Sequence, residues 1–217
     1  MLNSLRSNPI VRGFAALYAG TFLSGAWAII IPTIPVLARE FGVSAGGAAQ
    51  VVTAFAVGKF VGTAIGGIVL DRMGTRFALV GGPMVASVAA LGAAWVPWFT
   101  AILALALVMG AADSLWATAR EIAAIDLAQR NQRGRVISSL HGTYNIGMAM
   151  GPFLGGWLTD VFSFKAAFIA YAIATALSVF LGFAGPDFPV ALETKRIADT
   201  LGGWGWGSHQ AAGPGPY

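Results

Sequence analysis

The stretch GGIVLDRMGTRFALV, residues 66–80, joins two long apolar segments through a short charged one. Three charged side chains, Asp71, Arg72 and Arg76, fall within six residues around Gly74. Charge is scarce elsewhere, since only 10% of the whole chain is Asp, Glu, Lys or Arg. The pattern therefore predicts a polar turn between two apolar segments.

The composition indicates that the apolar segments lie in lipid. The 217 residues are 57% hydrophobic, with a mean hydropathy of +0.73, whereas soluble domains carry about 25% charged residues. The absence of cysteine excludes disulfides, thiolate metal sites and a cysteine nucleophile. The net charge is +4, but no soluble basic domain accompanies it, so a nucleic-acid partner is not expected.

Six stretches are apolar over the roughly 20 residues that a membrane crossing requires. Helices are expected throughout, because isolated strands cannot cross lipid with unpaired backbone groups. The sequence thus predicts an all-α membrane protein with a short N-terminus (1–12), a six-helix bundle (13–185) and a Pro- and Gly-rich, largely disordered tail (186–217). The predicted helices are 13–38, 46–70, 77–96, 100–121, 138–159 and 165–185.

The basic residues between these helices predict the orientation, because cytoplasmic loops are enriched in Lys and Arg. With six crossings, only Arg39 and Lys165 fall on one side. The sequence therefore places both termini in the cytoplasm of an inner-membrane protein. The basic residues on the cytoplasmic side are Arg6, Arg12, Arg72, Arg76, Arg130, Arg133, Arg135, Lys195 and Arg196, with Arg120 at the edge of a loop.

The segment that begins at Gly58 aligns without gaps to a second segment that begins at Gly147. In this alignment four glycines of the first segment match four glycines of the second, Asp71 matches Asp160, and Arg76 matches Lys165. Because three helices are an odd number, the second copy would enter the membrane from the opposite side. Such a 3+3 inverted repeat is typical of secondary transporters, although an old duplication in a non-transporting membrane protein would produce it too. The paired glycines are Gly58, Gly62, Gly66 and Gly67 with Gly147, Gly151, Gly155 and Gly156.

Two motifs resemble signatures of the major facilitator superfamily. Residues 67–76, GIVLDRMGTR, resemble its G-x-L-A-D-R-x-G-R-R signature between helices 2 and 3. Residues 147–156, GMAMGPFLGG, resemble the helix-5 signature of its drug and metabolite antiporters. The matching residues are Gly67, Asp71, Arg72, Gly74 and Arg76 in the first motif and Gly147, Gly151, Pro152, Gly155 and Gly156 in the second.

This resemblance implies the N-terminal six-helix half of a secondary transporter that moves a small organic molecule by alternating access. Proton-coupled efflux is the expected form, and Asp71 would hold the outward-open state against the opposite half. That second half would belong to the same chain if this sequence is a fragment, or to a second copy in a homodimer. One departure weakens the proton coupling: an arginine usual in helix 4 is replaced by Ala106.

The glycines spaced four apart in helices 2 and 5 predict close helix packing, as small-x-x-x-small faces do in membranes. This structural interpretation is preferred to a ligand-binding one. Pro152 would add a kink to helix 5 because it frees a backbone carbonyl.

Lys59 and Asp113 are charged residues deep within predicted membrane helices. Lys59 lies twelve residues from Asp71, and Asp113 lies seven from Arg120. At about 1.5 Å per residue, both fall well inside the hydrocarbon region. Charges there are rare and face the interior or a cavity. They predict substrate binding or proton exchange, with a snorkelling lysine, a backbone-satisfied Asp113 and a mutual ion pair as structural alternatives.

Several aromatic and polar residues in helices 1, 4 and 5 are candidates for a cavity wall. Such a mixed wall suits amphipathic organic substrates, although ordinary helix packing explains any single residue equally well. The candidates are Tyr18, Thr21, Phe22, Trp27, Trp116, His141, Tyr144, Asn145 and Met148.

No enzyme motif and no cofactor site is predicted. The sequence has no phosphate-binding G-x-x-x-x-G-K-[ST] loop, and only His141 and His209 could serve as histidine ligands. The expected partners are the lipid bilayer, a small-molecule substrate, protons and the second half. The alternative function is a non-transporting membrane scaffold, sensor or assembly factor that retains the transporter fold.

Overall fold

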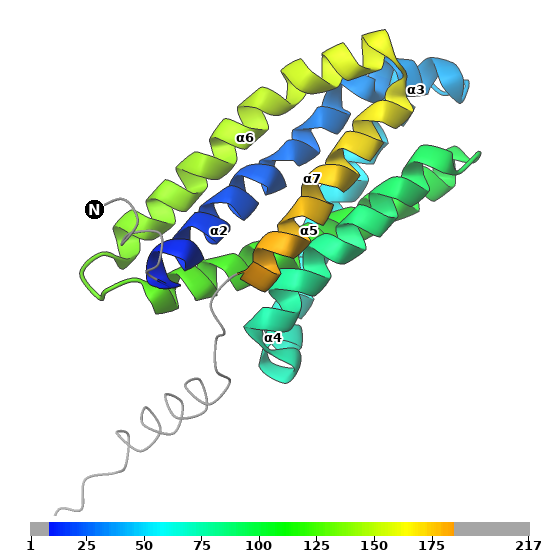
Figure 1. The fold of residues 1–217 in the computed structure, drawn as a ribbon. Helices are drawn as coiled ribbons and strands as arrows, with labels where there is room; N and C mark the ends of the chain where they lie inside the picture. Colours follow the sequence, from blue (N-terminus) through cyan, green and yellow to red (C-terminus); the bar gives the residue numbers. More distant parts are fainter. Residues whose placement is uncertain (1–8, 185–217) are drawn as a thin grey trace, which may run out of the picture. The chain divides into compact units, whose positions relative to one another are not determined.

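The computed structural model describes residues 9–184, and every regular element in this part of the chain is helical (Figure 1). Predictions for residues 1–8 and for the tail from residue 185 lie outside the described residues. The elements are α2 (Pro9–Ser24), η1 (Gly25–Thr33), α3 (Ile34–Glu40), α4 (Ala45–Trp95), α5 (Phe99–Leu127), α6 (Arg133–Val161) and α7 (Phe164–Ala184).

The first predicted helix, 13–38, is a continuous run of three elements over 9–40. Its middle third, η1, is wound as a 3₁₀-helix that contains Pro32. Proline lacks the backbone N–H that an α-helix needs, and 3₁₀ winding is common where such a helix is under local constraint. Pro35 then lies in the first turn of α3, where a missing N–H costs nothing.

Helix α4 contains residues 66–80, the charged stretch between two apolar segments, and doubles back at Gly74 (Figure 1). Its 51 residues would span roughly 77 Å if straight, more than twice the apolar thickness of a bilayer. Gly74 alone leaves the helical conformation, with φ 81° and ψ 159°, a region that glycine enters without steric cost. The predicted loop over 71–76 is therefore wrong in its extent: Asp71 remains helical, and the break is one residue wide.

The later helices begin and end near their predicted bounds but extend further into charged sequence. Helix α5 covers 99–127 instead of 100–121, and α6 covers 133–161 instead of 138–159. Apolar content marks only the portion of a helix that fits lipid. The polar ends of α5 and α6 were therefore missed.

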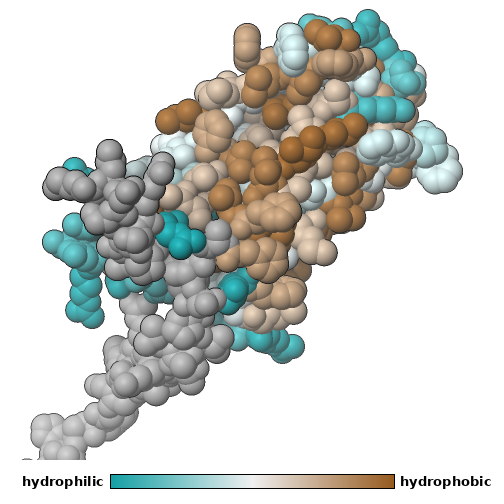
Figure 2. Space-filling view, viewed as in Figure 1, coloured by the Kyte–Doolittle hydropathy of each residue, from teal (hydrophilic) through white to brown (hydrophobic). Residues whose placement is uncertain are grey.

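Four described helices are long and apolar enough to cross a membrane. Helix α4 counts once among them, although it folds back on itself, and the 29-residue α6 is not among them. Figure 2 shows apolar residues over the middle of one face and hydrophilic residues at both ends. Large exposed side chains such as Phe60, Phe153 and Phe180 have the exposure expected of lipid-facing positions. The four are Val11–Glu40, Ala45–Trp95, Phe99–Leu127 and Phe164–Phe183.

Glycines bring the first leg of α4 into backbone contact with α5. A Cβ on Gly58 would lie 2.0 Å from the carbonyl oxygen of Leu107, and one on Gly110 would lie 2.0 Å from that of Phe55. Gly62 is almost as restricted, at 2.4 Å from the oxygen of Ala111. No larger residue fits these positions without moving a helix.

A second glycine contact joins α6 to the first helical run. Cβ atoms on Gly147 and Gly155 would lie 2.2 Å from the oxygen of Phe22 and 2.1 Å from that of Ile29. Gly151 meets Ala28 at 2.7 Å. The packing interpretation thus holds for these positions. It does not hold for Gly66, where a Cβ would meet nothing closer than 3.9 Å. Gly67 and Gly156, which lie outside the four-residue spacing, have no close contact either.

Candidate functional site

Lys59 of α4 and Asp113 of α5 form an ion pair inside the bundle. Lys59 Nζ lies 2.9 Å from Asp113 Oδ2, outside hydrogen-bond geometry. The Asp113 side chain is fully buried, whereas 34% of the Lys59 side chain is exposed. The close backbone contacts at Gly58 and Gly110 explain why Lys59 reaches Asp113, because they bring α4 and α5 together next to these residues. The ion-pair alternative drawn from the sequence is therefore present.

Ser24 and Arg120 complete the charged network. The Ser24 hydroxyl donates to Asp113 Oδ1 at 2.7 Å and accepts from Arg120 Nη2 at 3.1 Å. Arg120 also donates from Nη1 to the carbonyl oxygen of Gly20 at 3.0 Å, and its guanidinium lies 4.2 Å from the Trp116 ring centroid. One hydroxyl group thus connects a buried carboxylate to a buried cation.

The sequence-based interpretation of Arg120 as a loop-edge charge is wrong. Arg120 is 4% exposed and lies two turns after Asp113 in α5, with seven residues of the helix still to follow. Residues seven apart share a helix face, and this spacing was the available signal. Ser24 carried no comparable signal in the sequence.

A cluster of three aromatic side chains lies beside the Lys59 ammonium. Trp27 stacks on Phe55 with ring centroids 4.7 Å apart, and Trp27 Nε1 donates to the Tyr144 hydroxyl at 2.8 Å. Lys59 Nζ lies 5.4 Å from the Tyr144 ring centroid and 5.9 Å from that of Phe55, within the range of cation–π attraction. Phe55 was not among the predicted residues.

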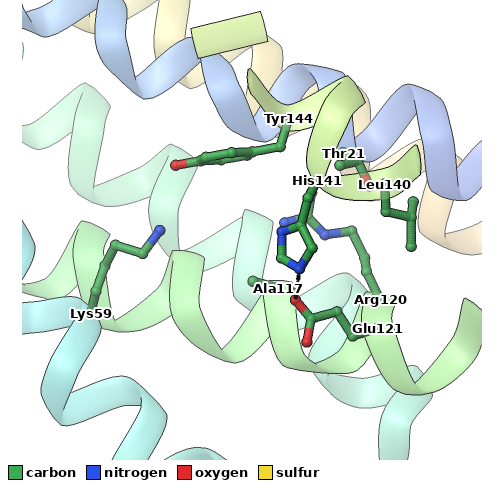
Figure 3. Close-up of a pocket in the computed structure, with 8 residues that line it drawn as sticks. All are labelled: Thr21, Lys59, Ala117, Arg120, Glu121, Leu140, His141 and Tyr144. Carbon is green, nitrogen blue, oxygen red and sulfur yellow. Dashed lines mark ion pairs between the residues drawn. The ribbon is translucent and has the colours of Figure 1, made fainter. Parts of the chain in front are cut away.

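A cavity of about 160 Å³ opens next to the network, between α2, α4, α5 and α6 (Figure 3). On its far edge His141 Nε2 lies 3.7 Å from Glu121 Oε1. Asp113 does not line the cavity, and its ion-pair partner Lys59 does. The lining residues are Thr21, Lys59, Ala117, Arg120, Glu121, Leu140, His141 and Tyr144.

The predicted wall residues thus divide into four groups. Thr21, His141 and Tyr144 line the cavity. Trp27 and Trp116 support it through the contacts given above, whereas Tyr18 hydrogen-bonds Ser139 away from it. The remaining predicted residues are exposed and do not line this cavity: Phe22, Asn145 and Met148. Glu121, Ala117 and Leu140 were missed, because their residue types are ordinary for a helix.

The two signature motifs occupy defined places in the fold. Asp71 and Arg72 are exposed in the last turn before the break at Gly74, and Arg76 is exposed in the turn after it. In α6, Pro152 is exposed inside the helix next to the buried Gly151. The first motif forms the tight bend of α4, and the second forms the glycine face against the first helical run.

Residues 16–204 match the Major Facilitator Superfamily. The chain belongs to this superfamily. It is 28% identical over 205 residues to an uncharacterized MFS-type transporter, Rv1877, of Mycobacterium tuberculosis, covering 93% of this chain and 29% of that protein. It is 26% identical over 187 residues to the multi-drug resistance efflux pump PmrA of Streptococcus pneumoniae, covering 82% of this chain and 46% of that protein.

Solved structures share the fold. The proton:xylose symporter XylE, bound to 6-bromo-6-deoxy-D-glucose, superposes with a TM-score of 0.76 over 91% of this chain and 49% of that one, at 18% identity. The chain thus spans about half the length of XylE and less than half of the curated relatives. Family and apolar helices together identify a multi-pass membrane protein of a transporter family, not an enzyme.

Proposed function

We propose that this chain is one half of a secondary transporter that moves a small organic molecule across the cell membrane with coupled protons. A second six-helix half, from the same polypeptide or from a second copy, would close the cavity from the other side. The length of the relatives supports this, since the chain covers 46% of PmrA and 49% of XylE. Rocking of the halves around a central site is the usual mechanism in such folds.

The proposed bundle has six crossings in a 3+3 inverted repeat. The glycine contacts support it: Gly58 and Phe55 of α4 have counterparts 89 residues later in Gly147 and Tyr144 of α6. Their contact partners are also related, since Leu107 and Gly110 of α5 lie 85 residues after Phe22 and Gly25. Two helix pairs therefore use matching positions, as repeated units would.

The proposed location is the inner membrane, with both termini in the cytoplasm. The basic residues around Gly74 and between α5 and α6 support this orientation. Asp71, beside the cytoplasmic bend, would then contact the second half and stabilise the outward-open state, as the signature implies.

The observation that carries the proposal is the fully buried carboxylate of Asp113, paired with Lys59 inside helices that cross the membrane. A proton from cavity water would add to the carboxylate, remove its charge and release the Lys59 ammonium toward the cavity. Ser24 and Arg120 hold the carboxylate in place during this step. Intramembrane charges arranged in this way are typical of proton relays.

Export in exchange for protons is the version that the helix-5 signature and the efflux-pump relative support. The cavity lining supports a second version, in which an organic anion and a proton move together, because Lys59 and Arg120 face the cavity and Asp113 does not. The two versions differ in the direction of proton movement relative to the compound.

Proton flux in proteoliposomes tests the proposal. Vesicles containing the chain and the pH indicator pyranine are exposed to ethidium, benzenesulfonate or chloramphenicol, one compound of each charge class. We expect at least one compound to drive proton flux, and Asp113→Asn to abolish it, because an amide cannot take up the proton. Asp160→Asn, at an exposed position, is the control and should retain the flux. Undiminished flux in Asp113→Asn contradicts the proposal, as does the absence of flux with every compound when the second half is present in the same vesicles.

A further inference from the structure

We propose that the ligand of this cavity is a small organic anion with an apolar ring, and that Lys59 binds its negative group. This assignment rests on the proposed transport function and names its substrate class. It follows from three features: the charge of the cavity wall, the accessibility of the two ends of the ion pair, and the aromatic side chains beside Lys59.

The charged network contains more positive than negative charge. Asp113 is a single carboxylate in a network with two cations, Lys59 at 2.9 Å and Arg120 through the Ser24 hydroxyl. Glu121 is the one carboxylate among the lining residues, and it brings the summed charge of Lys59, Arg120, Asp113 and Glu121 to zero. It lies at the far edge of the cavity, where its Oε1 is 3.7 Å from His141 Nε2. An anion in the cavity therefore meets the exposed Lys59 ammonium on the side away from Glu121 (Figure 3).

Accessibility leads to the same conclusion. Asp113 is fully buried, with Oδ1 occupied by Ser24 and Oδ2 by Lys59. A cationic ligand could reach this carboxylate only after displacing Lys59. Lys59 is the exposed end of the pair, and Figure 3 shows its amine extending toward the space beside Tyr144. An ammonium group has three donor hydrogens, so it can bind an anion at the cavity while it remains near Asp113.

The cavity also fits a single aromatic ring. Its volume is about 160 Å³, and about 150 Å³ accommodates benzene in a protein interior. Leu140 and Ala117 supply apolar surface, and the Tyr144 ring is fixed by its hydrogen bond from Trp27. The structure thus combines one accessible cation with a rigid apolar wall.

An anion on Lys59 and a proton on Asp113 would favour each other. Protonation of Asp113 releases Lys59 from its carboxylate partner, and the loaded site then has the same net charge as the empty ion pair. The proposed class therefore predicts movement of ligand and proton in the same direction, which is the second version given above.

Equilibrium binding to the full chain in lipid nanodiscs tests the assignment without requiring transport. The probes are benzenesulfonate, its neutral analogue benzenesulfonamide and the permanent cation benzyltrimethylammonium. We expect benzenesulfonate to bind at least about tenfold more tightly than either analogue, since hydrogen bonds to charged groups contribute that much or more. Lys59→Met should remove this preference, and Lys59→Arg should retain much of it.

Two further variants keep the result interpretable. Lys165→Met, at an exposed position in α7, is the matched control and should bind benzenesulfonate like the native chain. Asp113→Asn should bind it at least as tightly, because the competing carboxylate is gone. Lys59→Met leaves the Asp113–Ser24–Arg120 unit balanced in charge, so it should fold, and its thermal unfolding midpoint checks this.

Preferential binding of benzyltrimethylammonium, with loss in Asp113→Asn, would overturn the assignment, as would failure of benzenesulfonate to bind. Proton flux driven by ethidium or chloramphenicol would then still support the transport function. Conversely, Lys59-dependent binding of benzenesulfonate without any compound-driven flux, in vesicles that also contain the second half, would support the anion site and contradict the proposed transport.

Discussion

Ser24 connects the two buried charges of the site through one hydroxyl group. Ser24, Asp113 and Arg120 are each 4% exposed or less, so none of them can replace a lost partner with bulk water. A buried donor or acceptor without a partner is costly. The network therefore depends on Ser24 more strongly than the small size of serine suggests.

Ser24→Ala is expected to destabilise the protein by about 1.5–3 kcal/mol, since it removes hydrogen bonds to two charged groups. The midpoint of thermal unfolding in detergent measures the effect. Ser138→Ala, at an exposed position of α6, is the control and should leave the midpoint unchanged. Equal midpoints for the Ser24 and Ser138 variants would show that the bridge contributes nothing.

At the scale of residues, the sequence predicted that Lys59 and Asp113 belong to the functional site, because charges inside apolar helices are conspicuous. It could not predict Ser24, since serine is common in membrane helices. Arg120 was misread because its place near the end of an apolar stretch suggested a loop. The part of α5 beyond that stretch is helical, and this fact comes only from the structure.

At the scale of elements, glycine contacts set the distances between helices. One set of contacts joins α4 to α5, and a second joins α6 to the first helical run. In both sets, a Cβ added to a glycine would lie 2.0 to 2.4 Å from a backbone oxygen of the facing helix. The ion pair of Lys59 and Asp113 lies next to the first set. The geometry of the site is therefore a consequence of helix packing.

Gly58→Ala is expected to destabilise the bundle by about 1–3 kcal/mol, because its methyl group would overlap the Leu107 carbonyl oxygen at 2.0 Å. Gly67→Ala is the matched control in the same helix, where a Cβ meets nothing within 4 Å. It should be neutral or slightly stabilising, since alanine favours helix over glycine. Comparable thermal midpoints for the two variants would contradict this account of the packing.

The periodicity of the glycines predicted both packing faces, because spacing by four is visible in a sequence. It did not distinguish Gly58 from Gly66, where a Cβ would meet nothing closer than 3.9 Å, since that depends on which neighbour lies opposite. The bend of α4 shows the same limit: the charges predicted a turn, but only the backbone conformation of Gly74 shows that it is one residue wide.

At the scale of the whole molecule, the number of crossings remains a prediction. Hydropathy and length identify four spanning helices among residues 9–184, while the bend of α4 and the length of α6 are compatible with six crossings. The difference determines which side of the membrane each loop faces, so labelling of single cysteines can decide it. The chain has no native cysteine, which gives a clean background.

Six crossings place residue 130 in the cytoplasm and residue 165 outside. We therefore expect Lys165→Cys to react with a membrane-impermeant maleimide in intact cells and Arg130→Cys to react only after lysis. Both positions are exposed, and the cysteine-free chain is the control for unspecific labelling. Reaction of both variants in intact cells, or of Arg130→Cys alone, would contradict the topology.

In the proposed mechanism, Asp113 changes its protonation when a ligand binds in the cavity. Infrared difference spectroscopy of the reconstituted chain, with and without benzenesulfonate, observes this directly through the carbonyl band of a protonated carboxylic acid. We expect that band to gain intensity on binding in the native chain and in Asp160→Asn, and to be missing in Asp113→Asn. Identical difference spectra for the native chain and Asp113→Asn would contradict the claim.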